Sequence, residues 1–209
     1  MEIRHKFVGN TVLTRRSFLT AGSAAVAAGG AGCLESADTK SDDGGQDHDT
    51  ADPHDHSHGE EVTGPGSHAD VAMLTDEDGH YFAPHVVWVE TGGTVTWTNE
   101  SGSHTITAYH PGFDQPLRIP DTAEPWDSGM FSEDGVTFER QFEIDGVYDY
   151  FCIPHDYRAM VGTVIVGDPD PHDQPGLAEP QEELPEEARE LFEKLNAQVH
   201  DALDHDHDH

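Results

Sequence analysis

Four residues of types that bind soft metals stand in a pattern that predicts a specific chemistry. Cys152, His155 and Met160 form the motif C-x2-H-x4-M, and His104 follows a Ser-Gly-Ser turn earlier in the chain. One thiolate and two imidazoles in a plane, with a weak and distant thioether, form a copper site suited to one-electron transfer. The thiolate gives a soft covalent bond, the imidazoles suit both Cu(I) and Cu(II), and the thioether favours Cu(I). We therefore predict one type 1 copper ion held by these four side chains.

Each of these residues taken alone has an ordinary structural explanation. Cys152 would be a buried cysteine, Met160 a core residue and His155 a surface residue. Zinc is the competing metal, but a tetrahedral zinc site would favour another Cys, His or carboxylate over Met160, and copper leads the affinity order of divalent metals. Four further residues of the same segment are interpreted as surface or packing residues: His80, His85, His110 and Met130.

The segment from residue 70 to 167 has the pattern of an all-β domain that would position these ligands. Runs rich in β-branched and aromatic residues, several with strict alternation, occur at 71–74, 80–90, 94–99, 104–109, 136–144, 147–151 and 160–166. Turn signals stand at Thr91-Gly92-Gly93 and Asp145-Gly146. Six or seven short strands within about 100 residues predict a β-sandwich. The Pro-rich connection between Tyr109 and Val136 is expected to cover one side of it.

This segment resembles the plastocyanin and halocyanin family of cupredoxins. The C-x2-H-x4-M loop is similar to that of pseudoazurin and halocyanin-type proteins. Further similarity lies in Phe82-x-Pro84, Gly92-Gly93, Val95, Trp97, Asn99, Tyr148, Tyr150 and the run from Val161 to Val166. The resemblance covers about residues 70–167. It implies a Greek-key β-sandwich, the four ligands His104, Cys152, His155 and Met160, and electron entry through the edge of His155.

One position departs from the resemblance. Many relatives have Asn after the first His ligand, where it pins the two ligand loops and helps to hydrogen-bond the Cys sulfur, but this chain has Thr105. Because groups around the ligands tune the potential and rigidity of a metal site, this departure bears on the reduction potential more than on copper binding.

The charge of the chain excludes one class of function and indicates an environment. The 209 residues include 42 Asp and Glu against 10 Lys and Arg, a formal net charge of −32. A protein held on nucleic acid by phosphate contacts needs clustered basic residues, so nucleic acid is excluded as a partner. Dense carboxylates indicate a halophilic protein that stays soluble in high salt, and the alternative is an ordinary acidic protein with disordered tails.

Residues 1–32 have the pattern of an export signal. Arg15-Arg16, followed by Phe18-Leu19 and a run of small residues from Ala21 to Gly32, resembles a twin-arginine signal. Cys33 comes directly afterwards, which predicts a lipoprotein cleavage site with a lipidated Cys33; the alternative is a free or removed cysteine. We therefore predict an exported protein, lipid-anchored at the outer face of the cell membrane. Cys152 would then have no partner for a disulfide.

Two acidic segments flank the predicted domain. Residues 33–69 contain almost no large apolar residue and are predicted to be a disordered tether. Residues 168–209 are predicted to form a Pro- and acid-rich linker, an amphipathic helix over 185–203 and a tail. Alternating histidines occur in both segments, at 54, 56 and 58 and at 205, 207 and 209. They are either a metal-collecting tract or solvated disorder.

The function predicted from these features is electron transport by a monomeric blue copper protein between membrane redox proteins. We expect no enzymatic activity, because multicopper enzymes need further His-x-His sets within folded strands and dinuclear sites need two thiolates. The alternative is a copper-trapping or copper-delivery protein with the His-rich tails as collectors.

Overall fold

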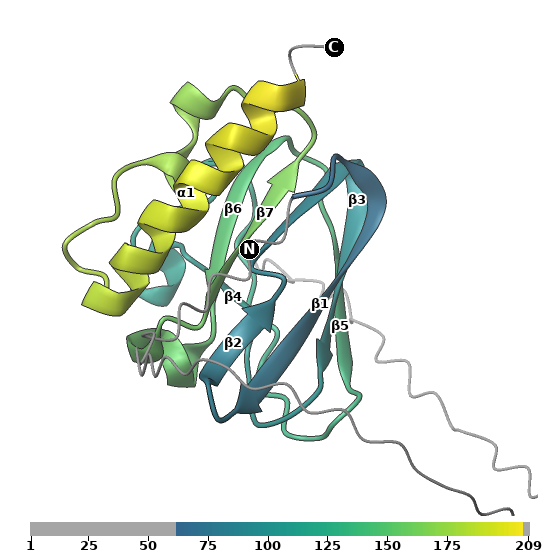
Figure 1. The fold of residues 1–209 in the computed structure, drawn as a ribbon, viewed down its shortest axis with the longest axis vertical. Helices are drawn as coiled ribbons and strands as arrows, with labels where there is room; N and C mark the ends of the chain where they lie inside the picture. Colours follow the sequence, from purple (N-terminus) through teal and green to yellow (C-terminus); the bar gives the residue numbers. More distant parts are fainter. Residues whose placement is uncertain (1–61, 207–209) are drawn as a thin grey trace, which may run out of the picture. The chain divides into compact units, whose positions relative to one another are not determined.

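Seven strands and one long helix form the framework of residues 62–206, the part of the chain that this computed structural model describes (Figure 1). The elements are β1 (Gly66–Asp76), β2 (Gly79–Ala83), β3 (Val86–Asn99), β4 (Thr107–Ala108), β5 (Thr137–Gln141), β6 (Gly146–Phe151), β7 (Val161–Val166) and α1 (Glu186–Asp206). The predicted all-β class and the C-terminal helix are thereby confirmed. The export signal, Cys33, most of the tether with its histidines, and the last three residues lie outside the described part.

The first strand begins before the predicted start of the domain. β1 starts at Gly66, whereas the sequence pattern placed residues 66–69 in the tether. The reason is that a small or polar residue can still pair through its backbone. His68 and Ala69 lie beside Thr94 and Val95 in a parallel ladder, which adds them to the sheet despite their low apolar content.

The strands follow the order β2-β1-β3-β7-β6-β4, and β5 pairs with β3 off this path. The two parallel pairs are β1 with β3 and β3 with β7, and the remaining pairs are antiparallel. β3 therefore joins the two halves of the fold: its beginning, Val86–Val89, pairs with β7, and its end, Thr94–Asn99, pairs with β1 and β5.

The turn predicted at Thr91-Gly92-Gly93 is wrong in one respect, because the strand continues through it. Gly92 has a φ of +82°, which bends the chain in a way that residues with a side chain rarely adopt. The backbone ladder survives the bend, since Gly92 donates to Phe142 (2.7 Å) and Phe142 donates to Gly93 (2.9 Å). The glycines thus bend one long strand rather than separate two strands.

Two apolar clusters lie on opposite faces of β6 and β7. The first, which contains Tyr148, Tyr150 and Val164, fills the interior together with Trp97 and Trp126. Trp126 comes from the Pro-rich connection, which confirms that this segment covers the interior. The second cluster covers the other face, so that every residue of both strands is buried.

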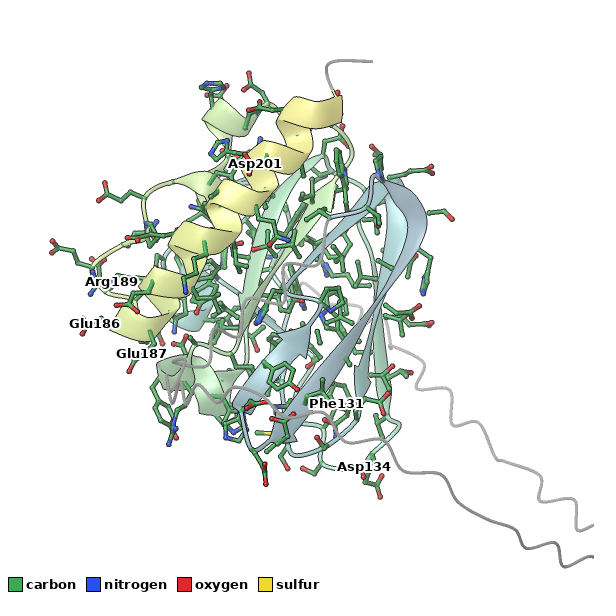
Figure 2. The ribbon with its side chains drawn as sticks, viewed as in Figure 1. Phe131, Asp134, Glu186, Glu187, Arg189 and Asp201 are labelled. Carbon is green, nitrogen blue, oxygen red and sulfur yellow. The ribbon has the colours of Figure 1, made fainter. Side chains whose placement is uncertain are left out.

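Helix α1 provides much of the second cluster. Its buried stripe of Ala188, Phe192, Leu195, Val199 and Leu203 packs with residues of β6 and β7, and Figure 1 shows it running alongside these strands. Figure 2 shows Glu186 and Glu187 pointing away from the sheet at the start of α1, which is the polar face of an amphipathic helix. No helix within residues 62–206 has the length and apolar character needed to cross a membrane.

A buried arginine connects the helix segment to the strands. The Arg118 guanidinium donates to the Asp149 carboxylate (2.7 Å), and both side chains are fully buried. It also donates to the carbonyl of Gly176 and to Gln181, and it lies 4.4 Å from the centre of the Phe192 ring. Burial raises the pKa of Asp149 to about 6 against the opposing effect of Arg118. The carboxylate is therefore ionised at neutral pH and balances the guanidinium.

Replacing Phe192 with Ala tests this packing. The ring is fully buried against Tyr109 and Arg118, so Phe192→Ala is expected to lower the free energy of unfolding by about 3–5 kcal/mol. Chemical denaturation followed by tryptophan fluorescence measures the loss. The neighbouring Glu193 is exposed, and Glu193→Ala should stay within about 0.5 kcal/mol of the natural protein. Equal stability of both variants would show that α1 does not pack as described.

Candidate metal centre

A short 3-10 helix between β6 and β7 carries the C-x2-H-x4-M motif. It spans Ile153–Arg158 with Pro154 in its first turn, where a missing N–H costs nothing, and ends at Ala159 in the left-handed conformation (φ 56°). The loop closes on itself: Cys152 N–H donates to Met160 C=O (3.0 Å), and Met160 N–H donates to His155 C=O (3.3 Å). Three of the four predicted ligands are thereby held by one hydrogen-bonded loop.

His104 reaches the same place from a different part of the chain. Its backbone pairs with Phe131, with hydrogen bonds of 2.9 and 2.8 Å in the two directions. Figure 2 shows Phe131 towards the opposite end of the molecule from Asp201, which lies near the end of α1. The predicted strand at 104–109 is shorter than expected, since only Thr107 and Ala108 form β4. A single backbone bridge is nevertheless enough to fix His104, which is fully buried.

The structure brings three of the predicted ligands together. The Sγ atom of Cys152 lies 3.6 Å from Nδ1 of His104 and 3.3 Å from Nδ1 of His155. Among the described residues, these three form the one group of His, Cys, Asp or Glu side chains suited to hold a metal, with donor atoms within 4.8 Å of one another. The fourth, Met160, has a fully buried side chain in the same apolar cluster as Cys152.

The surroundings of His104 fix the ring in the form that a metal needs. Its Nε2 atom lies 2.9 Å from the carbonyl oxygen of Ser101, which can only accept a hydrogen bond. The proton therefore sits on Nε2, and the lone pair on Nδ1 points towards Cys152. A hydrogen bond on the far side of the ring is the usual way in which a protein orients an imidazole ligand.

Thr105 joins the two ligand-bearing segments. Its backbone N–H lies 3.4 Å from the Sγ atom of Cys152, and its hydroxyl accepts a hydrogen bond from the backbone of Ile153 (2.8 Å). The hydrogen bond to sulfur comes from the backbone, so it does not depend on which side chain stands at this position. The hydroxyl pins the loop next to Cys152 to the segment that carries His104.

Burial keeps all three donor groups neutral in the metal-free protein. It raises the pKa of the Cys152 thiol to about 11, although hydrogen bonds from Thr105 and His155 oppose this. Burial, followed by the charge of the nearby His80, lowers the pKa of His155 to about 4. The pKa of His104 is also lowered by burial, against the opposing hydrogen bond to Ser101. At neutral pH the imidazoles can bind a metal at once, whereas the thiol must first lose its proton.

The donor set fits a type 1 copper ion. A soft thiol and two imidazoles, with a buried thioether on the same loop, are the ligands that such a site uses. The described residues add no carboxylate, Cys or further His to the group, so the four-donor set that structural zinc prefers is not assembled in this part of the chain.

One residue near the site was not recognised from the sequence. The ring of His80 stacks on the ring of His155, with centroids 3.6 Å apart and planes 7° apart. His80 lies in the β1–β2 hairpin, directly opposite Thr75. Its place beside the metal loop is a contact between segments far apart in the sequence, which the local pattern does not encode. The other three residues interpreted as surface or packing residues lie elsewhere: His85 contacts Val161 C=O, His110 caps a short 3-10 helix, and Met130 is exposed.

Comparison with known proteins identifies a family and several similar proteins. Residues 69–167 match the family of copper binding proteins described as plastocyanin/azurin. Halocyanin from Natronomonas pharaonis is 31% identical over 110 residues, which are 51% of this chain and 61% of that protein. Plastocyanin from Scenedesmus fuscus is 32% identical over 102 residues, 46% of this chain and 96% of that protein. The crystal structure of pseudoazurin from Hyphomicrobium denitrificans is 27% identical, with a TM-score of 0.48, 63% coverage of this chain and 98% of that one.

The protonation states predict the proton balance of metal binding. With both imidazoles neutral and the Cys152 thiol protonated, binding of Cu(II) near neutral pH should release about one proton. The affinity should therefore rise with pH below the thiol pKa of about 11 and fall more steeply below the His155 pKa of about 4. Calorimetric titration in buffers of different ionisation enthalpy measures the release. Cys152→Ser, which has no thiol proton to lose, is the control for copper bound elsewhere. Release of two or more protons above that control would contradict the neutral imidazoles.

Proposed function

Since the chain belongs to the plastocyanin/azurin family of copper-binding proteins, we propose that it is a one-electron carrier with a single type 1 copper site. We propose His104, Cys152, His155 and Met160 as its ligands. Bound copper supplies the Cu(I)/Cu(II) couple. The observation that carries this proposal is the meeting of one thiol and two imidazole Nδ1 atoms within 4.8 Å, on segments fixed by backbone hydrogen bonds.

The ligand arrangement supports fast electron exchange because it has little freedom to rearrange. His104 and Cys152 are fully buried, so water has no access to the donor atoms from their side. The hydrogen bonds from the His104 ring to the Ser101 carbonyl and from the Thr105 backbone N–H to the Cys152 sulfur hold both donors in place. A site that is rigid before the metal binds keeps one geometry in both oxidation states, and the geometric cost of each transfer is then small.

We propose that electrons enter and leave through the edge of His155. Its ring is partly exposed, whereas the other two donors are buried. Ile153 and Tyr157, on the same 3-10 helix as His155, are 50% and 60% exposed and give this helix an apolar surface. A partner that covers this helix would exclude water and approach the metal through a single imidazole.

The sequence supports a location and a class of partner. We propose that residues 1–32 export the protein, that Cys33 is lipidated, and that residues 33–69 tether the copper domain of residues 70–167 to the outer face of the membrane. Removal of residues 1–32 takes away four basic residues and one acidic residue. The remaining chain has 6 Lys and Arg against 41 Asp and Glu, a formal net charge of −35. We propose membrane redox proteins with a basic docking patch as donor and acceptor, in a saline environment that screens the attraction.

We further propose that the protein acts as a monomeric carrier rather than as an enzyme. The support is that the described residues assemble one mononuclear group of donors, without the further copper ligands that multicopper catalysis requires. A copper-delivery protein would instead have to release its ion readily. Four side chains on hydrogen-bonded segments are poorly suited to release.

The visible spectrum of the full chain loaded with Cu(II) tests the proposal. We expect an intense thiolate-to-copper band at about 600 nm that ascorbate bleaches and ferricyanide restores. Cys152→Ser should lose this band even where copper still binds to the His-rich segments. A colourless protein that holds copper in the same amount as Cys152→Ser would contradict the type 1 site.

Repeated redox cycling in the presence of a copper chelator separates a carrier from a delivery protein. A carrier is expected to keep its blue band through many cycles of ascorbate and ferricyanide, because neither oxidation state requires a ligand to leave. Transfer of the copper to the chelator within the first cycles would instead favour copper delivery.

A further inference from the structure

We infer that His80 and Thr75 are positioning residues that connect the two imidazoles of the proposed site and hold the His155 ring in its binding orientation. This inference rests on the proposed ligand set. It concerns two residues outside that set and outside the C-x2-H-x4-M loop. His80 would act through His155 and would not itself bind the metal.

The β1–β2 hairpin places both residues on the same side. Thr75 and His80 are directly opposed in the ladder, and Asp76 and Gly79 close the turn beside them. Opposed residues of an antiparallel pair project to the same face of the sheet. Here the Thr75 hydroxyl lies 2.8 Å from Nδ1 of His80, so the hairpin fixes the distance between the two side chains.

Thr75 also reaches the first imidazole of the site. Its Oγ1 atom lies 3.1 Å from Nε2 of His104, on the side of the ring opposite to Cys152. Because Nε2 carries one proton, its N–H is shared between the nearer Ser101 carbonyl (2.9 Å) and the Thr75 hydroxyl, and Thr75 can donate its own hydrogen to His80. One hydroxyl thus connects His104 with His80. The space around it is full, since a Cβ atom at Gly102 (φ +90°) would collide with Thr75 Oγ1 and lie 2.9 Å from His104 Nε2.

His80 completes the connection by stacking on the second imidazole. The His80 and His155 rings are nearly parallel at 3.6 Å, and the His104 ring meets each of them edge-on, at 6.1 and 5.1 Å. His155 sits on a short loop and is partly exposed, so its backbone alone does not fix the plane of its ring. The stacked ring covers one face of His155 and restricts its rotation. Thr75 in turn fixes His80 relative to His104.

The network has a functional consequence for the proposed site. The ligand nearest to the surface would be the one most easily displaced by water or by a docking partner. The His80 ring is connected to the buried His104 through Thr75 and stacks on His155. His155 would therefore keep its Nδ1 atom directed at Cys152, at the observed 3.3 Å, with or without the metal. Loss of such supporting contacts typically lowers metal affinity by about 10–100-fold.

Three variants separate the contacts of this network. His80→Ala removes both the stacking and the hydrogen bond, His80→Phe keeps a ring to stack, and Thr75→Val removes the hydroxyl at nearly constant volume. We expect His80→Ala and Thr75→Val to lose at least about tenfold in Cu(II) affinity, measured by chelator competition. Their Cu(II) electron paramagnetic resonance spectra should also change. The resonance spectrum of His80→Phe should instead be close to that of the natural chain. His68→Ala, which removes a half-exposed histidine from β1, is the matched control and should change neither quantity.

A second measurement uses the metal-free protein. Nuclear magnetic resonance of the His155 ring should show one ring orientation in the natural chain, in His80→Phe and in His68→Ala, and averaged signals in His80→Ala. Unchanged far-ultraviolet circular dichroism in each variant shows that the chain is still folded. Natural-like affinity, spectra and His155 signals in both His80→Ala and Thr75→Val would overturn the inference. Absence of a blue band in the natural chain would contradict the proposed function, while the His155 ring signals would still decide whether His80 positions the ring.

Discussion

The burial of β6 and β7 on both faces is the constraint on which the rest of the structure depends. Tyr148 and Tyr150 face the interior cluster, whereas Val147 and Phe151 face the cluster that contains α1. A shift of register by one residue would exchange these two sets and bury the Asp149 carboxylate away from its partner Arg118. The hairpin is therefore fixed in register, and so is the loop at its end, whose closing hydrogen bond joins Cys152 to Met160. A precise ligand geometry on a short loop follows from the rigidity of the strands beneath it.

The C-terminal segment is part of this construction rather than an appendage. Arg118 is fully buried, and its guanidinium needs more acceptors than Asp149 alone can supply. The carbonyls of Gly176 and Ala178 and the side chain of Gln181 accept its remaining hydrogen bonds. Removing one partner of a buried ion pair costs about 3–5 kcal/mol, because the other charge is left uncompensated. The segment that leads to α1 therefore both satisfies a buried charge and covers the outer face of the strands that carry the candidate metal loop.

Charge is distributed very differently at the centre and at the surface. The three donor groups are neutral when no metal is bound, and ionisation of Cys152 would add one negative charge if copper binds at the proposed site. One thiolate would balance Cu(I) completely and leave one positive charge with Cu(II), which suits a site with little water. The surface instead carries most of the 42 acidic residues of the chain, where water and salt stabilise them. The same protein can thus be strongly acidic and still keep a nearly neutral centre.

The sequence by itself determined the donor types, the alternation of most strands and the apolar stripe of α1, because each of these is encoded by neighbouring residues. The C-x2-H-x4-M motif pointed directly to the loop in which Cys152, His155 and Met160 are found. Only the tertiary structure decided that His104 lies beside this loop, where a single backbone bridge to Phe131 holds it. The stacking of His80 on His155 was likewise decided by the tertiary structure. It also decided that the glycines at 92 and 93 bend a continuous strand, since the ladder to Phe142 forms with residues far away in the sequence. The physical reason is that local pattern fixes which side of an element is apolar. Which side chains then meet depends on the register and packing of elements that are distant along the chain.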